Sequence, residues 1–273
     1  MTTLVTGARG AVATELIALL RRRGLPVRPA SRQPADPSIA TCDLTDPATF
    51  PAALAGVTSV FLYAEPAHID DFVKEATAAG VEHIVLLSSS SVLGPDAEVS
   101  PMAKSHLDVE RALTAASFRS TLLRPGTFAG NAQAWSWTVK AGNPVSLPYP
   151  NSSNDPIHEA DVAEAAAAVL TDPALGGRPY WLTGPASVTF AEQIAILSHV
   201  TGRDIAIKNV TREEWKAEMA DYIPGPFADA LLDWWQSNDG VPAEITTDLE
   251  RLIGRPGRTF ATWAADHVGD FTG

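Results

Sequence analysis

The sequence predicts an α/β fold in which a doubly wound parallel sheet is followed by a smaller, mostly helical C-terminal lobe. Strand-like apolar segments alternate with helical ones over the first two-thirds of the 273-residue chain, as in a parallel sheet covered on both faces. Beyond about residue 185 the strand signals give way to helices. We therefore expect a nucleotide-binding domain over residues 1–185 and a substrate lobe over 186–273, to which residues 128–155 also contribute.

The expected elements are apolar runs bounded by turn residues. In the first domain the strands are Thr2–Val5, Leu25–Ala30, Ile39–Cys42, Ser59–Tyr63, Glu82–Leu87, Ser120–Leu123 and Pro179–Leu182. The helices between them are Thr14–Arg23, a region near Phe50–Leu54, Ile69–Ala79, about Ala103–Ala115 and Glu159–Leu170. In the C-terminal lobe the helices are Phe190–Val200, Arg212–Ala220, Phe227–Gln236 and Ala243–Leu252, with glycine and proline residues at the breaks.

A glycine-punctuated turn follows the first expected strand and leads into the first helix. Gly7 permits a tight turn, and Gly10 lets a pyrophosphate approach the N–H groups at the helix start. Ala11 and Val12 supply those N–H groups, and the small Ala13 lets the helix pack close to the sheet. A second strand follows at the spacing of a dinucleotide-binding unit. The pattern predicts a nucleotide site; the alternative is a glycine turn that only packs helix on sheet.

The end of the second expected strand indicates which nucleotide binds. An acidic residue there usually binds both ribose hydroxyls of NAD, whereas an arginine accommodates the 2′-phosphate of NADP. This chain has Ser31 and Arg32 at that position and no acid before Asp36, and Arg9 lies in the glycine turn. Two guanidiniums and a hydroxyl suit a phosphate dianion, so we predict NADP(H). The alternative is that both arginines are solvated surface charges.

Composition and charge argue against several other classes of protein. A net charge of −12 and a pI near 4.9 do not suit a nucleic-acid-binding surface, which needs clustered cations. The longest apolar runs are shorter than the roughly 20 residues that span a bilayer, so we expect no membrane segment. Because Met1 runs straight into the first strand, we expect no signal peptide and a cytoplasmic location. The single cysteine, Cys42, excludes internal disulfides and is expected to be a buried small residue. The scattered histidines predict no metal site.

Several motifs along the chain belong together. The most specific one is Leu122-Leu123-Arg124-Pro125-Gly126-x-Phe128-x-x-Asn131. The others are Gly7–Ala13, Ser31-Arg32, Asp43-Leu44, Ser88-Ser89, His106-x-x-x-Glu110, Asp161–Ala163, Leu182–Pro185 and Leu252–Arg255. The series resembles the NmrA-like, or atypical, branch of the short-chain dehydrogenase/reductase superfamily, and the resemblance covers nearly the whole chain. It implies a Rossmann fold and NAD(P)H-dependent reduction, as in the quinone-reductase-like members of that branch.

The resemblance also implies roles for individual residues. Asp43 and Leu44 would contact the adenine. The loop after the fourth strand, from Tyr63 and Ala64 to Pro66, would line the nicotinamide side. Taken alone, Asp43 and Leu44 are equally a strand-to-loop exit, because aspartate favours turns.

The catalytic positions depart from those of conventional superfamily members. Those enzymes use a Tyr that protonates the developing alkoxide and a Lys four residues later that lowers the pKa of that Tyr. Aligned on Glu110, this chain has Met102 at the Tyr position and His106 at the Lys position. Met102 cannot transfer a proton. We expect His106 to hold the nicotinamide ribose or to relay a proton; the alternative is a histidine that only caps a cavity on the helix face.

Two further polar residues are candidates for the reaction. Ser88 follows the fifth strand, where the carboxyl edge of a parallel sheet meets ligand, and is expected to bind the cofactor or a substrate oxygen. Asn131 begins an expected helix beside that edge and would orient nicotinamide or substrate. Both have structural alternatives, because serines form turns and asparagines cap helices.

Aromatic residues gather outside the nucleotide domain. Trp135 and Trp137 follow Asn131 closely, so we expect at least one of them to contact substrate. Phe128 and Tyr222 are the other expected contacts, and a small, planar, apolar substrate such as a quinone would suit these rings. The sequence favours a reductase that delivers hydride from NADPH to a quinone or another conjugated carbonyl. The alternatives are a redox sensor that holds NADP(H) without turnover and an imine or ketone reductase. The sequence is also compatible with a homodimer.

Overall fold

The computed structural model describes residues 2–34 and 36–272, which form two compact units. The first unit comprises Met1–Pro125, Glu159–Leu182 and Asp248–Arg255, and the second comprises Gly126–His158, Thr183–Thr247 and Pro256–Gly273. The end of the middle segment at Leu182 lies close to the boundary expected at residue 185. The sequence does not predict the return of residues 248–255 to the first unit.

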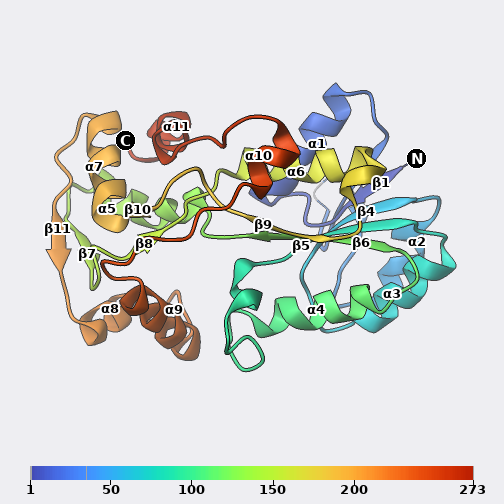
Figure 1. The fold of residues 1–273 in the computed structure, drawn as a ribbon, viewed down its shortest axis with the longest axis horizontal. Helices are drawn as coiled ribbons and strands as arrows, with labels where there is room; N and C mark the ends of the chain where they lie inside the picture. The colour runs from blue at the N-terminus through green and yellow to red at the C-terminus, as the bar shows by residue number, and fades with distance from the viewer. Residues whose placement is uncertain (1, 35, 273) are drawn as a thin grey trace. The chain divides into compact units, whose positions relative to one another are not determined.

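The first unit is built on a seven-stranded sheet, which confirms the predicted α/β fold class (Figure 1). The strands are β1 (Thr3–Val5), β2 (Val27–Ser31), β3 (Ala40–Thr41), β4 (Ser59–Tyr63), β5 (His83–Leu87), β6 (Arg119–Pro125) and β9 (Pro179–Leu182). They lie in the order β3-β2-β1-β4-β5-β6-β9, and every pair is parallel. The order reverses between β1 and β4, and ligands of doubly wound sheets bind beyond the carboxyl ends of the strands at such a point.

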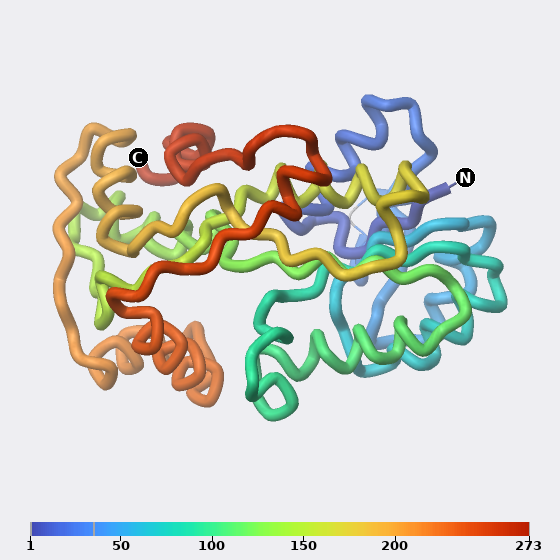
Figure 2. Tube along the Cα trace, viewed as in Figure 1, coloured from blue at the N-terminus to red at the C-terminus, as the bar shows by residue number. Residues whose placement is uncertain are grey.

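Helices cover both faces of this sheet. They are α1 (Ala11–Arg22), α2 (Phe50–Leu54), α3 (Ile69–Ala78), α4 (Lys104–Thr114), α6 (Glu159–Thr171) and α10 (Asp248–Ile253), with 3-10 turns at Pro47–Thr49, Ser90–Leu93 and Pro173–Leu175. Figure 1 shows α1, α6 and α10 over one face and α2, α3 and α4 over the other. Although α1 and α6 are far apart in sequence, they lie side by side (Figure 2).

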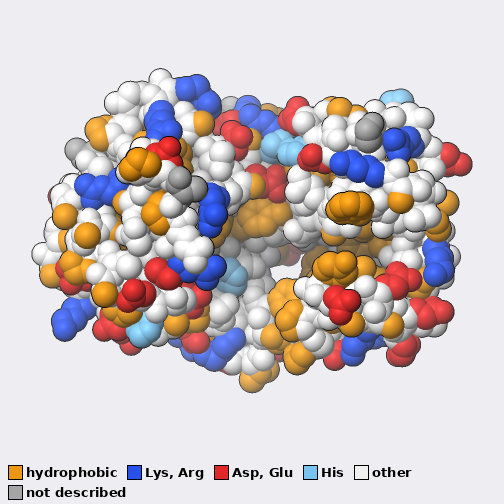
Figure 3. Space-filling model, turned by 180° about the vertical axis from the view of Figure 1, so that it is seen from behind, with side chains coloured by type: hydrophobic (Ala, Val, Ile, Leu, Met, Phe, Trp, Pro, Cys, Tyr) orange, Lys and Arg blue, Asp and Glu red, His pale blue; other side chains and the backbone are white. Residues whose placement is uncertain are grey.

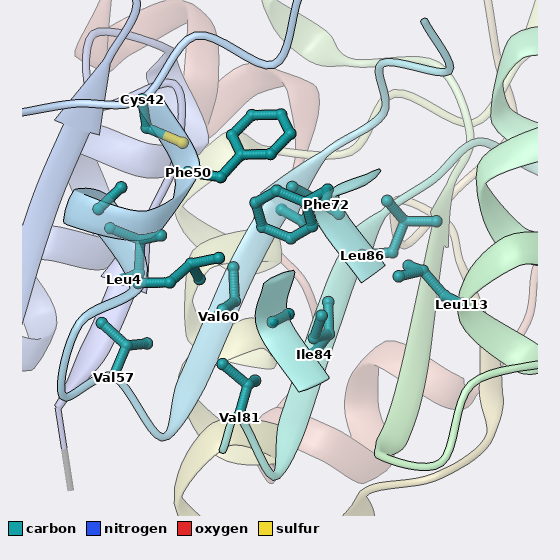
Figure 4. Packing of buried hydrophobic residues seen from close by; sticks show 14 of the residues in the cluster. Leu4, Cys42, Phe50, Val57, Val60, Phe72, Val81, Ile84, Leu86 and Leu113 are labelled. Carbon is teal, nitrogen blue, oxygen red and sulfur yellow. The ribbon is translucent and has the colours of Figure 1, made fainter. Parts of the chain in front are cut away.

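The core on the α2–α4 face joins these helices to the middle strands. Phe50 of α2 and Phe72 of α3 meet edge to face with ring centroids 5.2 Å apart. They pack with Leu4, Val60 and Ile84 from three neighbouring strands (Figure 4). Burial of these side chains fixes the strands whose carboxyl ends carry the candidate site.

The second unit contains short strands and helices. The strand pairs are β8 (Ser153–Asn154) with β10 (Val188–Thr189), which is antiparallel, and β7 (Val145–Leu147) with β11 (Ile207–Asn209), which is parallel. The helices are α5 (Ser136–Lys140), α7 (Phe190–Thr201), α8 (Arg212–Met219), α9 (Gly225–Ser237) and α11 (Phe260–Asp266), with 3-10 turns at Ala129–Trp135 and Val268–Asp270. Its main core surrounds the fully buried Trp263, which stacks on Phe260 at 5.5 Å.

Two expectations about the C-terminal part are wrong. The helix expected over Ala243–Leu252 begins only at Asp248, because side-chain oxygens hold the preceding backbone in another conformation. The Ala243 N–H donates to Ser187 Oγ at 2.9 Å, and the Thr246 N–H donates to Thr183 Oγ1 at 3.0 Å. The helix Phe260–Asp266 was not expected, although Thr259 caps it as a threonine N-cap does.

The surface carries mixed charge. On the face shown in Figure 3, Lys and Arg side chains are interspersed with Asp and Glu, and the residues drawn there form no continuous basic track. Within residues 2–34 and 36–272, no helix is both long enough and apolar enough to cross a membrane.

Candidate dinucleotide-binding site

The predicted glycine turn is formed between β1 and α1. Gly7 has a φ of +59°, in the left-handed region that favours glycine. The Gly10 N–H donates to the Gly7 carbonyl at 2.8 Å and closes the turn. The Ala8 N–H donates to the Ala30 carbonyl at 2.9 Å, which ties the turn to β2.

The start of α1 offers backbone N–H groups to an anion. The helix begins at Ala11 and not at the expected Thr14, with Gly10 as an N-cap that supplies no side-chain hydrogen bond. The first N–H groups of a helix have no intrahelical partner, and the helix dipole makes this end positive. Val12 and Ala13 are buried, whereas Ala11 is exposed. This helix end therefore fits a pyrophosphate.

The end of β2 carries a buried hydroxyl without a partner. Ser31 is 4% exposed, and its Oγ makes no hydrogen bond within the described chain. Arg32 and Arg9 are exposed. Hydrogen bonds from Thr45 lower the pKa of Asp43, and the Arg32 charge lowers it further. A buried unpartnered hydroxyl followed directly by an arginine fits a phosphate group.

The Tyr63 ring lies across the glycine turn. Its expected contact on the nicotinamide side stays a prediction. A Cβ on Gly7 would come within 2.8 Å of the Tyr63 Cδ2, and a Cβ on Gly10 within 2.4 Å of its hydroxyl oxygen. The Tyr63 N–H donates to Thr6 Oγ1 at 3.0 Å, which fixes the end of β4 against β1. A side chain at either position would force the Tyr63 ring to move, and Gly7 also has a positive φ that favours glycine.

The remaining residues expected at the cofactor contact the protein itself. The Asp43 carboxylate accepts from the Thr45 N–H at 3.0 Å and from the Thr45 hydroxyl at 2.7 Å, which is the turn-forming arrangement. Leu44 and Ala64 are partly buried and pack against the core of the α2–α4 face. Their contacts with adenine and nicotinamide stay predictions.

Ser88 belongs to a buried network. Its hydroxyl donates to Glu110 Oε1 at 2.6 Å, which leaves the Ser88 oxygen as an acceptor. Arg124 donates to both oxygens of the same carboxylate, at 2.9 and 2.6 Å. Glu110 is 4% exposed, and the three residues come from β5, α4 and β6. Ser88 therefore has a structural partner, and its contact with cofactor or substrate stays a prediction.

His106 is the titratable side chain with an unpartnered nitrogen in the first turns of α4. Its Nδ1 is buried and makes no hydrogen bond within the described chain. Burial lowers the pKa of His106, and the nearby Glu110 offsets part of that shift. Met102 is partly buried, and its carbonyl accepts from the Ser91 hydroxyl at 3.0 Å. Lys104 pairs with Asp108, which lies one turn further along the same helix.

The expected substrate residues lie in the second unit. Trp135 is partly buried and packs against its core, edge to face with Phe190 at 5.9 Å, and its contact with substrate stays a prediction. Trp137 is 85% exposed, Tyr222 is 80% exposed, and Phe128 is partly buried. Asn131 is exposed and lies within a 3-10 turn, not at the start of an α-helix.

Asp155 is a buried carboxyl that sequence reasoning missed. It accepts from the Thr127 N–H at 3.1 Å, and burial raises its pKa to about 6. A Cβ on Gly126 would come within 1.8 Å of Asp155 Oδ2, so a side chain at position 126 would displace this carboxylate. That glycine is part of the most specific motif, which is the signal that could have indicated a close approach there.

Cys42 is buried at 3% exposure, as predicted, and burial raises its thiol pKa to about 12. Such a thiol is a poor nucleophile. Among the described side chains, no group of three or more His, Cys, Asp or Glu residues is placed to hold a metal ion.

Comparison with known proteins gives this site its context. Residues 7–173 match the model of a family described as NAD(P)H-binding. The chain belongs to this family. It is 33% identical to the (4-alkanoyl-5-oxo-2,5-dihydrofuran-3-yl)methyl phosphate reductase of Streptomyces griseus, over 98% of both chains. It is 28% identical to the NAD(P)H azoreductase of Xenophilus azovorans, again over 98% of both chains.

Solved structures agree with these relatives. An NADPH-dependent quinone oxidoreductase from Escherichia coli superposes with a TM-score of 0.79 at 26% identity, covering 97% of this chain and 98% of that one. The predicted membership of the NmrA-like branch is confirmed. The chain is an NAD(P)H-dependent oxidoreductase.

Proposed function

We propose that this protein is an NADPH-dependent reductase that delivers hydride to a quinone or another conjugated carbonyl compound without a tyrosine acid. One observation carries the proposal. At α4, where a conventional enzyme has its Tyr and Lys, Met102 precedes the helix and His106 keeps an unpartnered, buried Nδ1.

The preference for NADPH over NADH rests on the end of β2. A ribose 2′-phosphate would supply an acceptor for the buried Ser31 hydroxyl and an ion pair for Arg32 and Arg9. A 2′-hydroxyl is instead usually bound by an acidic residue at this position, and this chain has none there.

The cofactor, when bound, supplies the hydride, and the protein residues position it and manage the proton. Reduction of a quinone gives a stabilised anion, so water can provide the proton and no strong acid is needed. That requirement is compatible with methionine at position 102. A neutral His106, favoured by its lowered pKa, can accept a hydrogen bond from a ribose hydroxyl or donate one at Nδ1, depending on its tautomer.

The names of the relatives support a conjugated acceptor. They include a reductase of a dihydrofuranone, an azoreductase and a quinone oxidoreductase. Each acceptor class accepts hydride into a delocalised system. For the second unit we propose Trp137 and Tyr222 as substrate contacts in preference to Trp135, because their rings are exposed. Asn131, also exposed, remains a proposed polar contact.

The experiment is a turnover assay with purified protein. NADPH and NADH oxidation is measured with a panel of quinones, conjugated lactones, azo compounds, ketones and imines, alongside cofactor affinity. We expect quinones or conjugated carbonyls to be reduced with NADPH and simple ketones to be poor substrates. Turnover of imines or simple ketones alone would contradict the proposal.

A redox sensor is the second candidate function, and Met102 favours it as well, because a sensor needs no proton donor. Such a protein would bind NADP(H) without oxidising NADPH in the presence of any acceptor. Tight NADPH binding together with no turnover across the panel would therefore favour the sensor over the reductase.

A further inference from the structure

The Tyr63 ring lies very close to the glycine turn that contains Gly7 and Gly10. Its hydroxyl oxygen lies 2.4 Å from the position that a Cβ on Gly10 would take, and its Cδ2 lies 2.8 Å from the Cβ position on Gly7. The ring thus runs along the turn from one glycine to the other. It meets Phe61 edge to face at 5.8 Å, and its backbone N–H is held by Thr6.

The phenol oxygen replaces a missing helix cap. Ser, Thr, Asp and Asn at an N-cap usually accept a hydrogen bond from the second or third N–H of the helix, but Gly10 has no side chain for this. The Ala13 N–H instead forms a hydrogen bond with the Tyr63 oxygen. The oxygen lies next to where the side chain of an N-cap residue would be. Ala11 and Val12 are left with N–H groups for a ligand.

The hydroxyl hydrogen is available for another contact. The hydrogen bond with the Ala13 N–H uses a lone pair of the Tyr63 oxygen and does not occupy the hydroxyl hydrogen. Burial raises the pKa of Tyr63, and the hydrogen bond from Ala13 offsets only part of the rise, so the phenol stays protonated at neutral pH. A neutral phenol whose oxygen already accepts a hydrogen bond from the backbone can still donate its hydrogen to an anion.

We propose that Tyr63 is a pyrophosphate-binding residue, whose O–H donates a hydrogen bond to a phosphate oxygen of the dinucleotide beside the N–H groups of Ala11 and Val12. The proposal rests on membership of the NAD(P)H-binding family and not on the acceptor that is reduced. Glycine-rich turns ordinarily bind a pyrophosphate with backbone N–H groups alone. Tyr63 would add a side-chain donor to such a site.

The test is a series of binding measurements on Tyr63→Phe by calorimetry, with three ligands. NADP⁺ contains the pyrophosphate, adenosine 2′,5′-bisphosphate keeps one of its phosphates, and adenosine 2′-monophosphate keeps neither. We expect NADP⁺ affinity to fall roughly tenfold or more, because the lost bond has a charged acceptor. Affinity for adenosine 2′-monophosphate should be unchanged, and the bisphosphate shows which of the two phosphates is contacted.

The matched control is Tyr180→Phe in the same unit. The Tyr180 hydroxyl donates to the Leu175 carbonyl at 2.6 Å and accepts from Arg178 at 2.8 Å, in the loop and strand around β9. This variant also loses a buried phenol, so it should lower the melting temperature while NADP⁺ binding stays as in the wild type. If Tyr63→Phe does not fold, ring-labelled tyrosine NMR of the wild type, which has four tyrosines, tests the same contact. The signals of one ring should then shift with NADP⁺ and not with adenosine 2′-monophosphate.

Three results would overturn the proposal. Unchanged NADP⁺ affinity would mean that the hydroxyl makes no contact with the pyrophosphate. Tighter binding would mean that the hydroxyl obstructs the pyrophosphate site. An equal loss for adenosine 2′-monophosphate would mean that the substitution acts through the fold of the unit. None of these depends on turnover, so failure of the reductase proposal would be seen separately.

Discussion

Two regions at one edge of the sheet in the first unit differ in whether their polar groups have partners within the protein. Around β1, β2 and β4, the Ser31 hydroxyl and the first N–H groups of α1 are left for a ligand. Around β5, β6 and α4, the polar groups bind one another, with Ser88 and Arg124 both on the Glu110 carboxylate. There His106 keeps a buried nitrogen without a partner in the described chain.

The difference teaches how to interpret motifs. The most specific segment of the sequence contains Arg124 and Gly126, and both have structural roles: one pairs with Glu110 and the other makes room for Asp155. The less specific glycine turn is the part that we expect to face a ligand. Strong similarity in the β6 region therefore indicates the fold, whereas the chemistry has to be argued from the groups left unpartnered.

The largest effect should come from breaking the β5–β6–α4 network. Glu110→Ala removes the partner of a guanidinium whose side chain is 19% exposed and should lower the free energy of unfolding by about 3–5 kcal/mol. The measurement is urea unfolding of the purified protein. Lys104→Ala, which breaks an exposed pair on the same helix, is the control and should cost less than about 1 kcal/mol. A loss at Glu110 as small as that of the control would remove the contrast between the two regions.

A buried acid in the second unit extends the comparison, because Asp155 has backbone donors and a raised pKa. Its pKa of about 6, against 3.8 for the ordinary group, means that the ionised form is disfavoured in the folded state. Its contribution is fully favourable below about pH 3.8 and is lost as the pH rises through about 6. That loss is on the order of 3 kcal/mol.

Asp155→Asn should therefore remove this part of the pH dependence while keeping an acceptor for the Thr127 N–H. Unfolding free energies at pH 4 and pH 7 provide the measurement. Asp172→Asn is the control, because it replaces an exposed aspartate that accepts from the Ala174 N–H and keeps Asp155 in place. Parallel pH curves for the wild type and Asp155→Asn would show that the carboxyl does not titrate in this range.

The fold could be predicted from the sequence because its signals are local. The apolar run Ser59–Tyr63 and the strand Pro179–Leu182 have the expected bounds, and the fold class follows from their alternation with helices. The helix expected from Ala243 fails because Ser187 and Thr183, distant in sequence, bind its backbone. Such contacts leave no local pattern.

Some features of the candidate site could be predicted from the sequence and others could not. The glycine turn and the Ser31-Arg32 pair are predicted from neighbouring residues, although α1 begins three residues earlier than expected and β2 extends to Ser31. The partner of Ser88 and the place of the Tyr63 ring depend on side chains from other elements, which spacing does not encode. Trp135 and Trp137 show the same limit, since Trp135 packs against the core at Phe190 whereas Trp137, two residues later, is exposed.

The open region around β2 should respond in affinity and not in stability. Arg32→Ala should weaken NADPH binding by about 1.5–3 kcal/mol, the scale of a hydrogen bond between charged groups, and leave NADH binding nearly unchanged. Calorimetric titration with both cofactors measures this, and unfolding in urea should match the wild type because Arg32 is exposed. Equal losses for the two cofactors, or tighter binding of NADH by the wild type, would contradict a 2′-phosphate site.

The smallest effect should come from Met102, although it stands at the position of the conventional acid. If the acceptor needs no strong acid, Met102 contributes only packing, and Met102→Leu should keep kcat within a few-fold of the wild type because the two side chains have similar volume. His106→Ala, from the following helix, is the comparison: it should lower kcat on the order of 10²-fold if His106 relays a proton and much less if it only packs. Turnover with a quinone and NADPH measures both. A large loss from Met102→Leu in a protein that still unfolds like the wild type would show that position 102 acts on the reaction. It would also show that the alignment of α4 on Glu110, from which the absence of an acid is inferred, is wrong.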